Sequence, residues 1–223
     1  IKDYLRCVQS VDDNIGRVLK YLDDTGLAEN TVVIYSSDQG WYLGEHGWYD
    51  KRWMYEESLM MPFIVNWPGV TKPGSRDTHL IQNLDYAETF LDIAGAKIPA
   101  DMQGTSLVPL LRGQNPKDWR SSIYYHYYEY PSVHMIPRHY GIRTERYKLM
   151  HFYQVGNEWV LYDLQSDPDE LQNLYGKKGT AKLAADLKKQ LRGLQKHYED
   201  DSDISEKPKE WQDRVRPGTA TKN

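Results

Sequence analysis

Asp38 and Gln39 are the two residues whose types and position point most clearly to chemistry. They follow Thr31 to Tyr35, an unbroken β-branched and aromatic run that predicts a buried parallel strand. Open α/β sheets bind their ligands at the carboxyl ends of such strands. A carboxylate beside an amide oxygen offers hard oxygen donors, which suit Ca²⁺ or Mg²⁺ better than zinc. Asp-Gln-Gly is also a common turn sequence, so a purely structural role stays open.

A glycine-punctuated loop continues this polar stretch, with Gly44-Glu45-His46-Gly47 followed by Asp50-Lys51-Arg52. Lys51 could balance an anionic substrate oxygen that also touches the metal, or it could be a surface lysine. Asp50 and Arg52 could grip neighbouring sugar hydroxyls, or they could form an ordinary ion pair. The glycines around His46 favour a histidine that structures the loop over a general acid.

Two further histidines, His134 and His139, lie in what reads as a proline- and tyrosine-bearing loop after a tyrosine-rich strand. From a smaller lobe either could bind substrate, and either could instead be bonded within its own loop. The 18 tyrosines far outnumber the 3 phenylalanines. Tyrosine-rich walls often line sugar sites, but half-buried strand positions explain the same composition.

The first half of the chain predicts an α/β fold that positions Asp38. Apolar residues at spacings of three and four predict a helix over residues 1–25, ended by Gly26, and 62–65 predicts a second core strand. A helical turn is expected at 107–111. A helix over 84–94 is expected to point five residues inward: Leu84, Ala87, Phe90, Leu91 and Ala94.

From Ser121 onward, short tyrosine-rich runs separated by turn signals predict an antiparallel sheet. Its strands are expected at 123–128, 140–143, 147–153 and 160–164, and a leucine-marked helix near the end is expected to cover it. These patterns divide the chain into an α/β part (1–118), an antiparallel β subdomain with its packing helix (119–200) and a charged tail (201–223).

Composition excludes several classes of protein. The formal net charge of -4 gives no basic surface for nucleic acid, and no apolar run approaches the ~20 residues of a membrane span. The single cysteine, Cys7, excludes an internal disulfide and a multi-cysteine zinc site.

Taken together, the string from Ser36 to Val65 resembles the type I, formylglycine-dependent sulfatases of the alkaline-phosphatase superfamily. The resemblance extends to Gly141-Ile142-Arg143-Thr144-Glu145-Arg146-Tyr147-Lys148 and, more loosely, to nearly the whole chain. It implies part of an alkaline-phosphatase-like parallel sheet sandwiched by helices. The segment from Tyr124 to Thr144 looks most like enzymes that act on N-acetylglucosamine 6-sulfate of glycosaminoglycans.

The resemblance also implies roles for particular residues and a cofactor. Asp38 and Gln39 would be ligands of one Ca²⁺ ion, with Gln39 standing where many relatives have Asn or His. Lys51 would be catalytic, contacting the sulfate oxygens and stabilising charge on the bridging oxygen. Asp50, Arg52, His134 and His139 remain the candidates for substrate binding. Members of this family are exported to the periplasm, the lysosome or the cell exterior.

The family's formylglycine is made from Cys or Ser in a Cys/Ser-x-Pro/Ala-x-Arg motif, which Cys7-Val8-Gln9-Ser10-Val11 does not match. The formylglycine and the remaining metal ligands are therefore expected in an N-terminal part of the same enzyme, and this chain alone is expected to be inactive. Two alternatives remain. One is a phosphatase or phosphodiesterase of the same superfamily, and the other is a non-catalytic carbohydrate-binding module.

Overall fold

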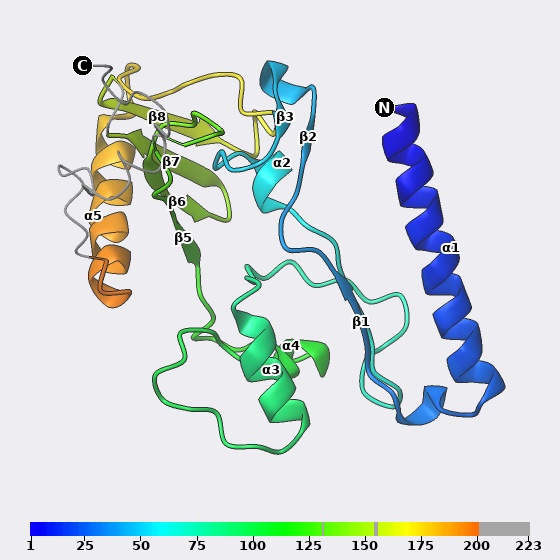
Figure 1. Cartoon of the computed structure of the whole chain (residues 1–223). Helices are drawn as coiled ribbons and strands as arrows, with labels where there is room; N and C mark the ends of the chain where they lie inside the picture. Colours follow the sequence, from blue (N-terminus) through cyan, green and yellow to red (C-terminus); the bar gives the residue numbers. More distant parts are fainter. Residues whose placement is uncertain (131, 154–155, 201–223) are drawn as a thin grey trace, which may run out of the picture. The chain divides into compact units, whose positions relative to one another are not determined.

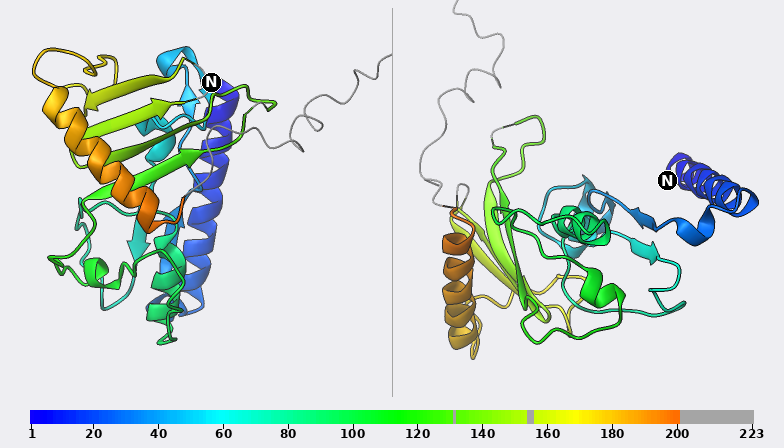
Figure 2. Two further views of the ribbon diagram at one scale, coloured as in Figure 1. Left: turned by 90° about the vertical axis from the view of Figure 1, so that its left-hand side faces the viewer. Right: turned by 90° about the horizontal axis from the view of Figure 1, so that it is seen from below.

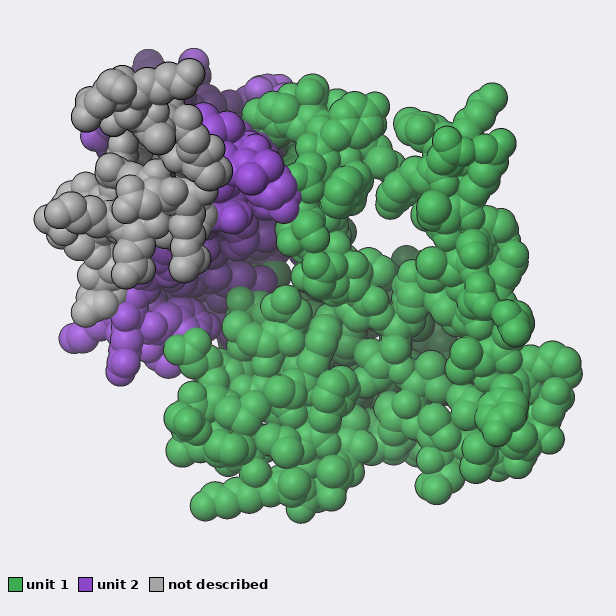
Figure 3. Space-filling view, viewed as in Figure 1, with its two compact units in different colours: residues 1–51, 60–119 green, residues 52–59, 120–223 purple. Residues whose placement is uncertain are grey.

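The computed structural model describes residues 1–130, 132–153 and 156–200, which form two compact units (Figure 3). Unit 1 contains residues 1–51 and 60–119, and unit 2 contains 52–59 and everything from 120 onward. The chain passes from unit 1 to unit 2 between residues 119 and 120. Residues 52–59 also belong to unit 2, so the chain enters unit 2 briefly, returns to unit 1 at residue 60 and enters unit 2 again at residue 120. The expected tail, 201–223, lies outside the described residues.

The helix expected at the start of the chain is confirmed as α1 (Lys2–Asp24), which the short η1 (Ala28–Asn30) follows (Figure 1). Gly26 lies just beyond the end of α1 with a φ of +69°, a conformation that glycine adopts without strain. None of the side chains of α1 is buried. Its apolar stripe, which includes Leu5, Val8 and Val11, is exposed to solvent.

The two expected core strands of unit 1 are present, but their direction differs from the prediction. β1 (Val33–Ser36) pairs with β4 (Phe63–Asn66) in antiparallel register, Val33 opposite Asn66 and Ser36 opposite Phe63. Neither strand is fully buried, and Ile64 is exposed. The prediction of a buried parallel strand here is therefore wrong. An apolar run indicates a strand, but it does not encode the direction of the neighbouring strand.

The helices expected near 84–94 and 107–111 are α3 (Asp85–Ile93) and α4 (Val108–Leu111). The predicted inward face of α3 is wrong: Phe90 is 52% exposed, whereas Asp85, Glu88 and Thr89 are buried. These polar side chains bind the backbone before α4. Asp85 Oδ1 accepts from Thr105 N (2.9 Å), Glu88 Oε1 from Gly104 N (2.6 Å) and Thr89 Oγ1 from Leu107 N (2.8 Å). Backbone satisfaction thus decides the orientation of this helix.

Unit 2 contains the predicted antiparallel sheet. Its strands are β5 (Ser122–Tyr127), β6 (His139–Thr144), β7 (Tyr147–Phe152) and β8 (Glu158–Asp163), in the order β5-β6-β7-β8 (Figures 1 and 2).

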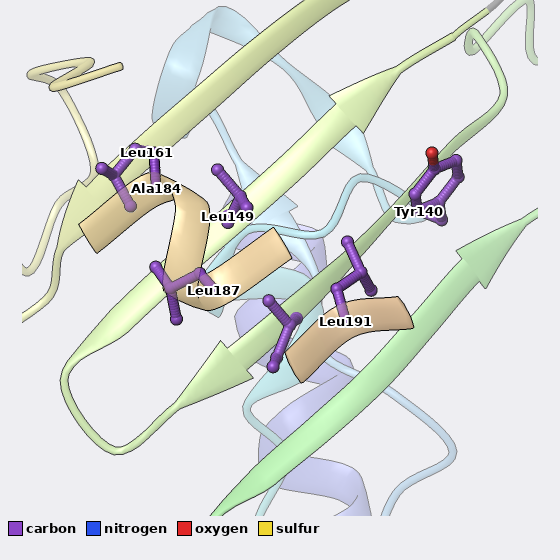
Figure 4. Packing of buried hydrophobic residues seen from close by; sticks show 7 residues of the cluster. Tyr140, Leu149, Leu161, Ala184, Leu187 and Leu191 are labelled. Atoms are coloured by element: carbon purple, nitrogen blue, oxygen red, sulfur yellow. The ribbon is translucent and has the colours of Figure 1, made fainter. Parts of the chain in front are cut away.

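The predicted helix α5 (Ala181–His197) covers one face of this sheet. Leu187 and Leu191 pack with Ile142, Leu149 and Leu161, and all five are almost completely buried (Figure 4). This cluster is the main hydrophobic core of unit 2.

Residues 52–59, which end in the single-turn helix α2 (Glu56–Leu59), pack against residues on the opposite face of this sheet. Side chains alternate between the faces along each strand. Tyr125, Gly141 and Met150 are register partners on the face away from α5. Met54 is completely buried beside Gly141. Unit 2 is therefore a sheet between a helix that follows it in sequence and a segment that precedes it by about sixty residues.

Candidate active site

Asp38 and Lys51 lie together at the end of β1, as the sequence predicted for a loop that folds back over the strand. Lys51 Nζ lies 3.2 Å from Asp38 Oδ2. The hydrogen bond and charge of Lys51 hold the pKa of the Asp38 carboxyl below its usual value. The Asp38 side chain is 77% exposed and that of Lys51 is 25% exposed. An ionised, accessible carboxylate therefore lies next to a half-buried cation.

A small hairpin carries Lys51 to this position. It consists of β2 (Tyr42–Leu43), the turn η2 (Glu45–Gly47) and β3 (Tyr49–Asp50). The His46 ring lies 6.2 Å from the buried ring of Tyr42 and 6.1 Å from that of Trp48. Glu45 Oε2 accepts from Leu43 N at 2.6 Å, which lowers the pKa of Glu45. His46 is thus part of an aromatic cluster that shapes the hairpin, the role favoured by its flanking glycines.

The residues on either side of Lys51 have an unusual backbone conformation. Asp50 has a φ of +88° and Arg52 a φ of +93°. Non-glycine residues in such regions cost of order 1–3 kcal/mol each and persist only where the surroundings fix them. Such strain concentrates at ligand-binding segments, so it supports the choice of this tripeptide as a functional one.

The two predicted substrate-binding histidines lie in different environments. His134 is exposed in the loop between β5 and β6, where its backbone N–H donates to Ser132 Oγ at 3.3 Å. His139 begins β6 instead of lying in a loop, and it is 0% exposed. Its ring stacks on Trp53 at 5.6 Å, and burial lowers its pKa to about 4. Complete burial disfavours direct contact between His139 and a ligand, so its role as a substrate residue stays a prediction.

Sequence reasoning missed a buried cluster of charges in unit 2. The Nζ atom of Lys148, a residue with no exposed surface, lies 2.8 Å from Glu56 Oε1 and 2.7 Å from Glu170 Oε1. Arg143 NH2 contacts Glu56 Oε2 at 3.0 Å. Arg143 and Lys148 are register partners in β6 and β7. Two cations side by side on the inward face of a predicted hairpin could have indicated that acidic side chains lie against them.

Calcium fits the chemistry of the donors after β1 but needs more of them. Asp38 and Gln39 offer two oxygen-bearing side chains, whereas Ca²⁺ takes 6–8 oxygen ligands. Within residues 1–130, 132–153 and 156–200, no group of three or more His, Cys, Asp or Glu side chains is arranged to hold a metal ion. The described residues therefore provide at most part of a calcium site.

Residues 44–197 match the protein family described as N-sulphoglucosamine sulphohydrolase, C-terminal. The chain belongs to this family. It is similar to an N-acetylglucosamine-6-O-sulfatase of Bacteroides thetaiotaomicron, with 50% identity over 90% of this chain and 36% of the relative. The human N-acetylglucosamine-6-sulfatase is 39% identical over 53% of this chain and 22% of its own length.

The solved structures agree with this assignment. A structure in complex with its substrate D-glucosamine-2-N,6-O-disulfate superposes with a TM-score of 0.88 and 50% identity, over 92% of this chain and 42% of that one. A phosphonate monoester hydrolase of Agrobacterium radiobacter superposes with a TM-score of 0.75 and 26% identity, over 84% of this chain and 39% of that one. The fold is thus the expected alkaline-phosphatase-like one, and the chain spans about two fifths of these proteins. Among the residues the structure describes, no helix is long and apolar enough to cross a membrane.

Proposed function

We propose that the protein containing this chain is a sulfuric ester hydrolase that removes sulfate from a sulfated sugar, with N-acetylglucosamine 6-sulfate of glycosaminoglycans as the substrate class. The relative with 50% identity carries that activity in its name, and the similar solved structure holds a 6-O-sulfated glucosamine. The observation that carries the proposal is the pairing of Lys51 with Asp38 at the end of β1. A cation next to a carboxylate that could hold a metal ion can stabilise negative charge on a sulfate ester oxygen.

Each candidate residue then has a distinct task. Asp38 and Gln39 would hold Ca²⁺, which supplies positive charge that polarises the sulfate group when bound. Lys51 would contact the sulfate oxygens and stabilise the charge that develops on the bridging oxygen as the S–O bond breaks.

The sugar itself would be recognised by neighbouring residues. Asp50 and Arg52 would bind sugar hydroxyls, since a carboxylate and a guanidinium form strong, directional hydrogen bonds. His134, exposed on its loop, is the further candidate for binding the substrate.

Three parts of the proposal concern the whole enzyme. The formylglycine nucleophile and the remaining calcium ligands would come from an N-terminal part that the chain does not contain. The sequence after Cys7 supports the first part, because it has neither the Pro or Ala nor the Arg of the modification motif, and Cys7 lies within the helix α1. Export from the cytoplasm is proposed on the resemblance to sulfatases alone.

The test measures sulfate release from N-acetylglucosamine 6-sulfate by the complete enzyme, before and after removal of calcium with a chelator. Activity should disappear with the chelator and return with Ca²⁺. Lys51→Ala should lower kcat by at least about 100-fold, as expected for an electrostatic contact to the reacting group. Lys189→Ala, on the exposed side of α5, is the matched lysine control and should keep full activity. Sulfate release that survives Lys51→Ala would refute the assignment of the site.

Phosphoester or phosphonate ester hydrolysis is the second candidate. It is favoured by the phosphonate monoester hydrolase structure and by a multifunctional alkaline phosphatase superfamily protein of Trinickia caryophylli, 31% identical over 82% of this chain and 38% of its own length. Assaying the same enzyme on an aryl phosphonate monoester separates the two. A higher kcat/KM for the phosphonate than for any sulfated sugar would favour this candidate. A carbohydrate-binding module without chemistry would instead bind glycan after chelation and after Lys51→Ala.

A further inference from the structure

Arg52 is the first residue of unit 2, and several contacts fix its backbone there. Its N–H donates to Ser58 Oγ at 3.2 Å. Its carbonyl accepts a hydrogen bond of 2.6 Å from the hydroxyl of Tyr125 in β5. Burial raises the pKa of Tyr125, so the hydroxyl keeps its proton at neutral pH and can donate this bond. Both bonds act on a residue whose φ of +93° requires restraint from its surroundings.

The next two residues are held by packing. Trp53 stacks on His139 and lies 5.5 Å from the ring of Phe152. Met54 lies against Gly141 so closely that a Cβ added at this glycine would be 2.6 Å from the Met54 sulfur. Such a Cβ would also collide with the Leu149 carbonyl oxygen, so the close packing at this position requires glycine.

The buried charges hold the end of the segment. Glu56 Oε1 and Oε2 contact Lys148 and Arg143 respectively, and the Glu56 N–H donates to Glu170 Oε2 at 2.7 Å. Glu170 itself has a φ of +50°. Ionic contacts of this kind, shielded from water, add little net stability but strongly favour one geometry over others.

We propose that Tyr125 is a positioning residue for Arg52, supported by Gly141 and the Lys148–Glu56–Glu170 cluster, so that the C-terminal sheet sets the enzyme's affinity for its sugar. The inference rests on the proposed function in that Arg52 is taken to bind the sugar. It adds that a hydroxyl from β5, which touches no substrate, governs how well Arg52 does so.

The first experiment replaces Tyr125 with Phe in the complete enzyme, which removes the hydroxyl and keeps the ring. KM for N-acetylglucosamine 6-sulfate should rise about tenfold, as expected for the loss of one hydrogen bond that orders a binding residue. Hydrolysis of a small aryl sulfate, which has no sugar hydroxyls for Arg52 to bind, should be unchanged. Tyr140→Phe is the matched control because Tyr140 is a buried tyrosine of the same sheet whose hydroxyl bonds His151. It should behave like the wild type on both substrates.

A double-mutant cycle shows whether Tyr125 acts through Arg52. Arg52→Ala should raise KM for the sugar substrate on its own. Adding Tyr125→Phe to Arg52→Ala should then change KM by less than about twofold, because the residue it positions is gone. Independent, multiplying effects of the two substitutions would overturn the proposal, and so would an equal loss of activity on the sugar and the aryl sulfate.

A readout without activity separates failure of this inference from failure of the proposed function. Trypsin cuts after Lys51 and Arg52, and a segment released from the sheet is cut faster. Cleavage there should be about tenfold faster in Tyr125→Phe than in the wild type or Tyr140→Phe, while cleavage after Lys189 stays the same. If the enzyme hydrolyses no sulfate ester, the proposed function fails and this measurement alone decides on the positioning of Arg52. Equal cleavage in all three proteins would refute the positioning role.

Discussion

At the scale of single residues, the two glutamates around Lys148 differ in a measurable way. Burial acts to raise the pKa of both carboxyls. At Glu56 the charges of Lys148 and Arg143 outweigh burial, and the pKa is lower than usual. Glu170 faces Lys148 without the arginine, and burial keeps its pKa raised. The ionised form is therefore less stable at Glu170 than at Glu56, and the negative charge of Glu170 is the less favourable of the two.

Removing Lys148 should expose this difference. Lys148→Met leaves two buried carboxylates with only Arg143 to balance them, and should lower the free energy of unfolding by about 3–5 kcal/mol. Adding Glu170→Gln removes the less favourable charge and should recover part of that loss. Urea denaturation of the complete enzyme, followed by tryptophan fluorescence, measures both. A double variant no more stable than Lys148→Met would contradict the assigned asymmetry.

His139 should make the protein sensitive to acid. Burial lowers its pKa to about 4 from 6.5, so between these values the unfolded chain binds a proton that the folded chain does not. Stability therefore falls as the pH drops from about 6.5 to about 4, by roughly 3 kcal/mol at most, and the effect levels off below pH 4. In His139→Phe, which keeps an aromatic ring among Trp53 and Tyr127, the change in unfolding midpoint between pH 7 and pH 4.5 should be clearly smaller. An unchanged pH dependence would show that His139 is protonated in the folded state.

At the scale of elements, the sequence predicted local structure better than it predicted orientation. The strands β5 to β8 and the helix α5 were predicted correctly because tyrosine-rich runs, turn signals and a leucine stripe each report on a local contact pattern. The direction of β1 relative to β4 depends on a partner 30 residues away, and the inward face of α3 depends on backbone amides at 104–107. Neither the strand direction nor the helix orientation produces a periodic pattern in the sequence.

The candidate site shows the same division. The proximity of Lys51 to Asp38 agrees with the expectation of a long, glycine-punctuated loop that folds back over the end of the strand. The packing of residues 52–59 on the C-terminal sheet was not predictable, because its determinants are single contacts such as Met54 against Gly141. A glycine in a strand reports that something lies close, but not what it is.

The fit of β6 to residues 52–59 can be tested with two glycine-to-alanine substitutions. A Cβ at Gly141 would collide with the Leu149 carbonyl oxygen and with Met54 Sδ at 2.6 Å, so Gly141→Ala should destabilise the protein by about 1–3 kcal/mol. Gly193 lies exposed within α5 with no atom within 4 Å of such a Cβ, so Gly193→Ala should stabilise by about 0.5–1 kcal/mol. Calorimetric midpoints of the two variants should move in opposite directions. A neutral Gly141→Ala would mean that β6 and Met54 are not in close contact.

At the scale of the whole molecule, the 223-residue chain presents apolar surface that a soluble protein normally buries. The exposed side chains of α1 include Leu5, Val8 and Val11, and Ile64 of β4 and Met60 are exposed as well. Exposed apolar surface of this extent promotes association.

The isolated chain should therefore bind a hydrophobic dye such as ANS strongly and release no sulfate from any sulfated sugar. Replacing Val8 and Val11 with Lys, both on the exposed stripe of α1, should lower dye binding and raise solubility without restoring activity. Dye fluorescence and size-exclusion chromatography check the first two expectations, and a sulfate assay checks the third. Turnover by the purified chain would refute the proposal that the nucleophile lies outside it.

The discontinuous composition of unit 2 has a consequence for how the protein is made. Residues 52–59 leave the ribosome long before the strands and the Glu170 turn to which they bind. At about 5–20 residues per second, the segment beginning at Arg52 waits roughly 6 to 24 seconds for its partners to be synthesised. During that interval nothing holds its backbone in the conformation that it has in the folded protein. Premature termination shortly before Glu170 would therefore disturb a segment synthesised more than a hundred residues earlier.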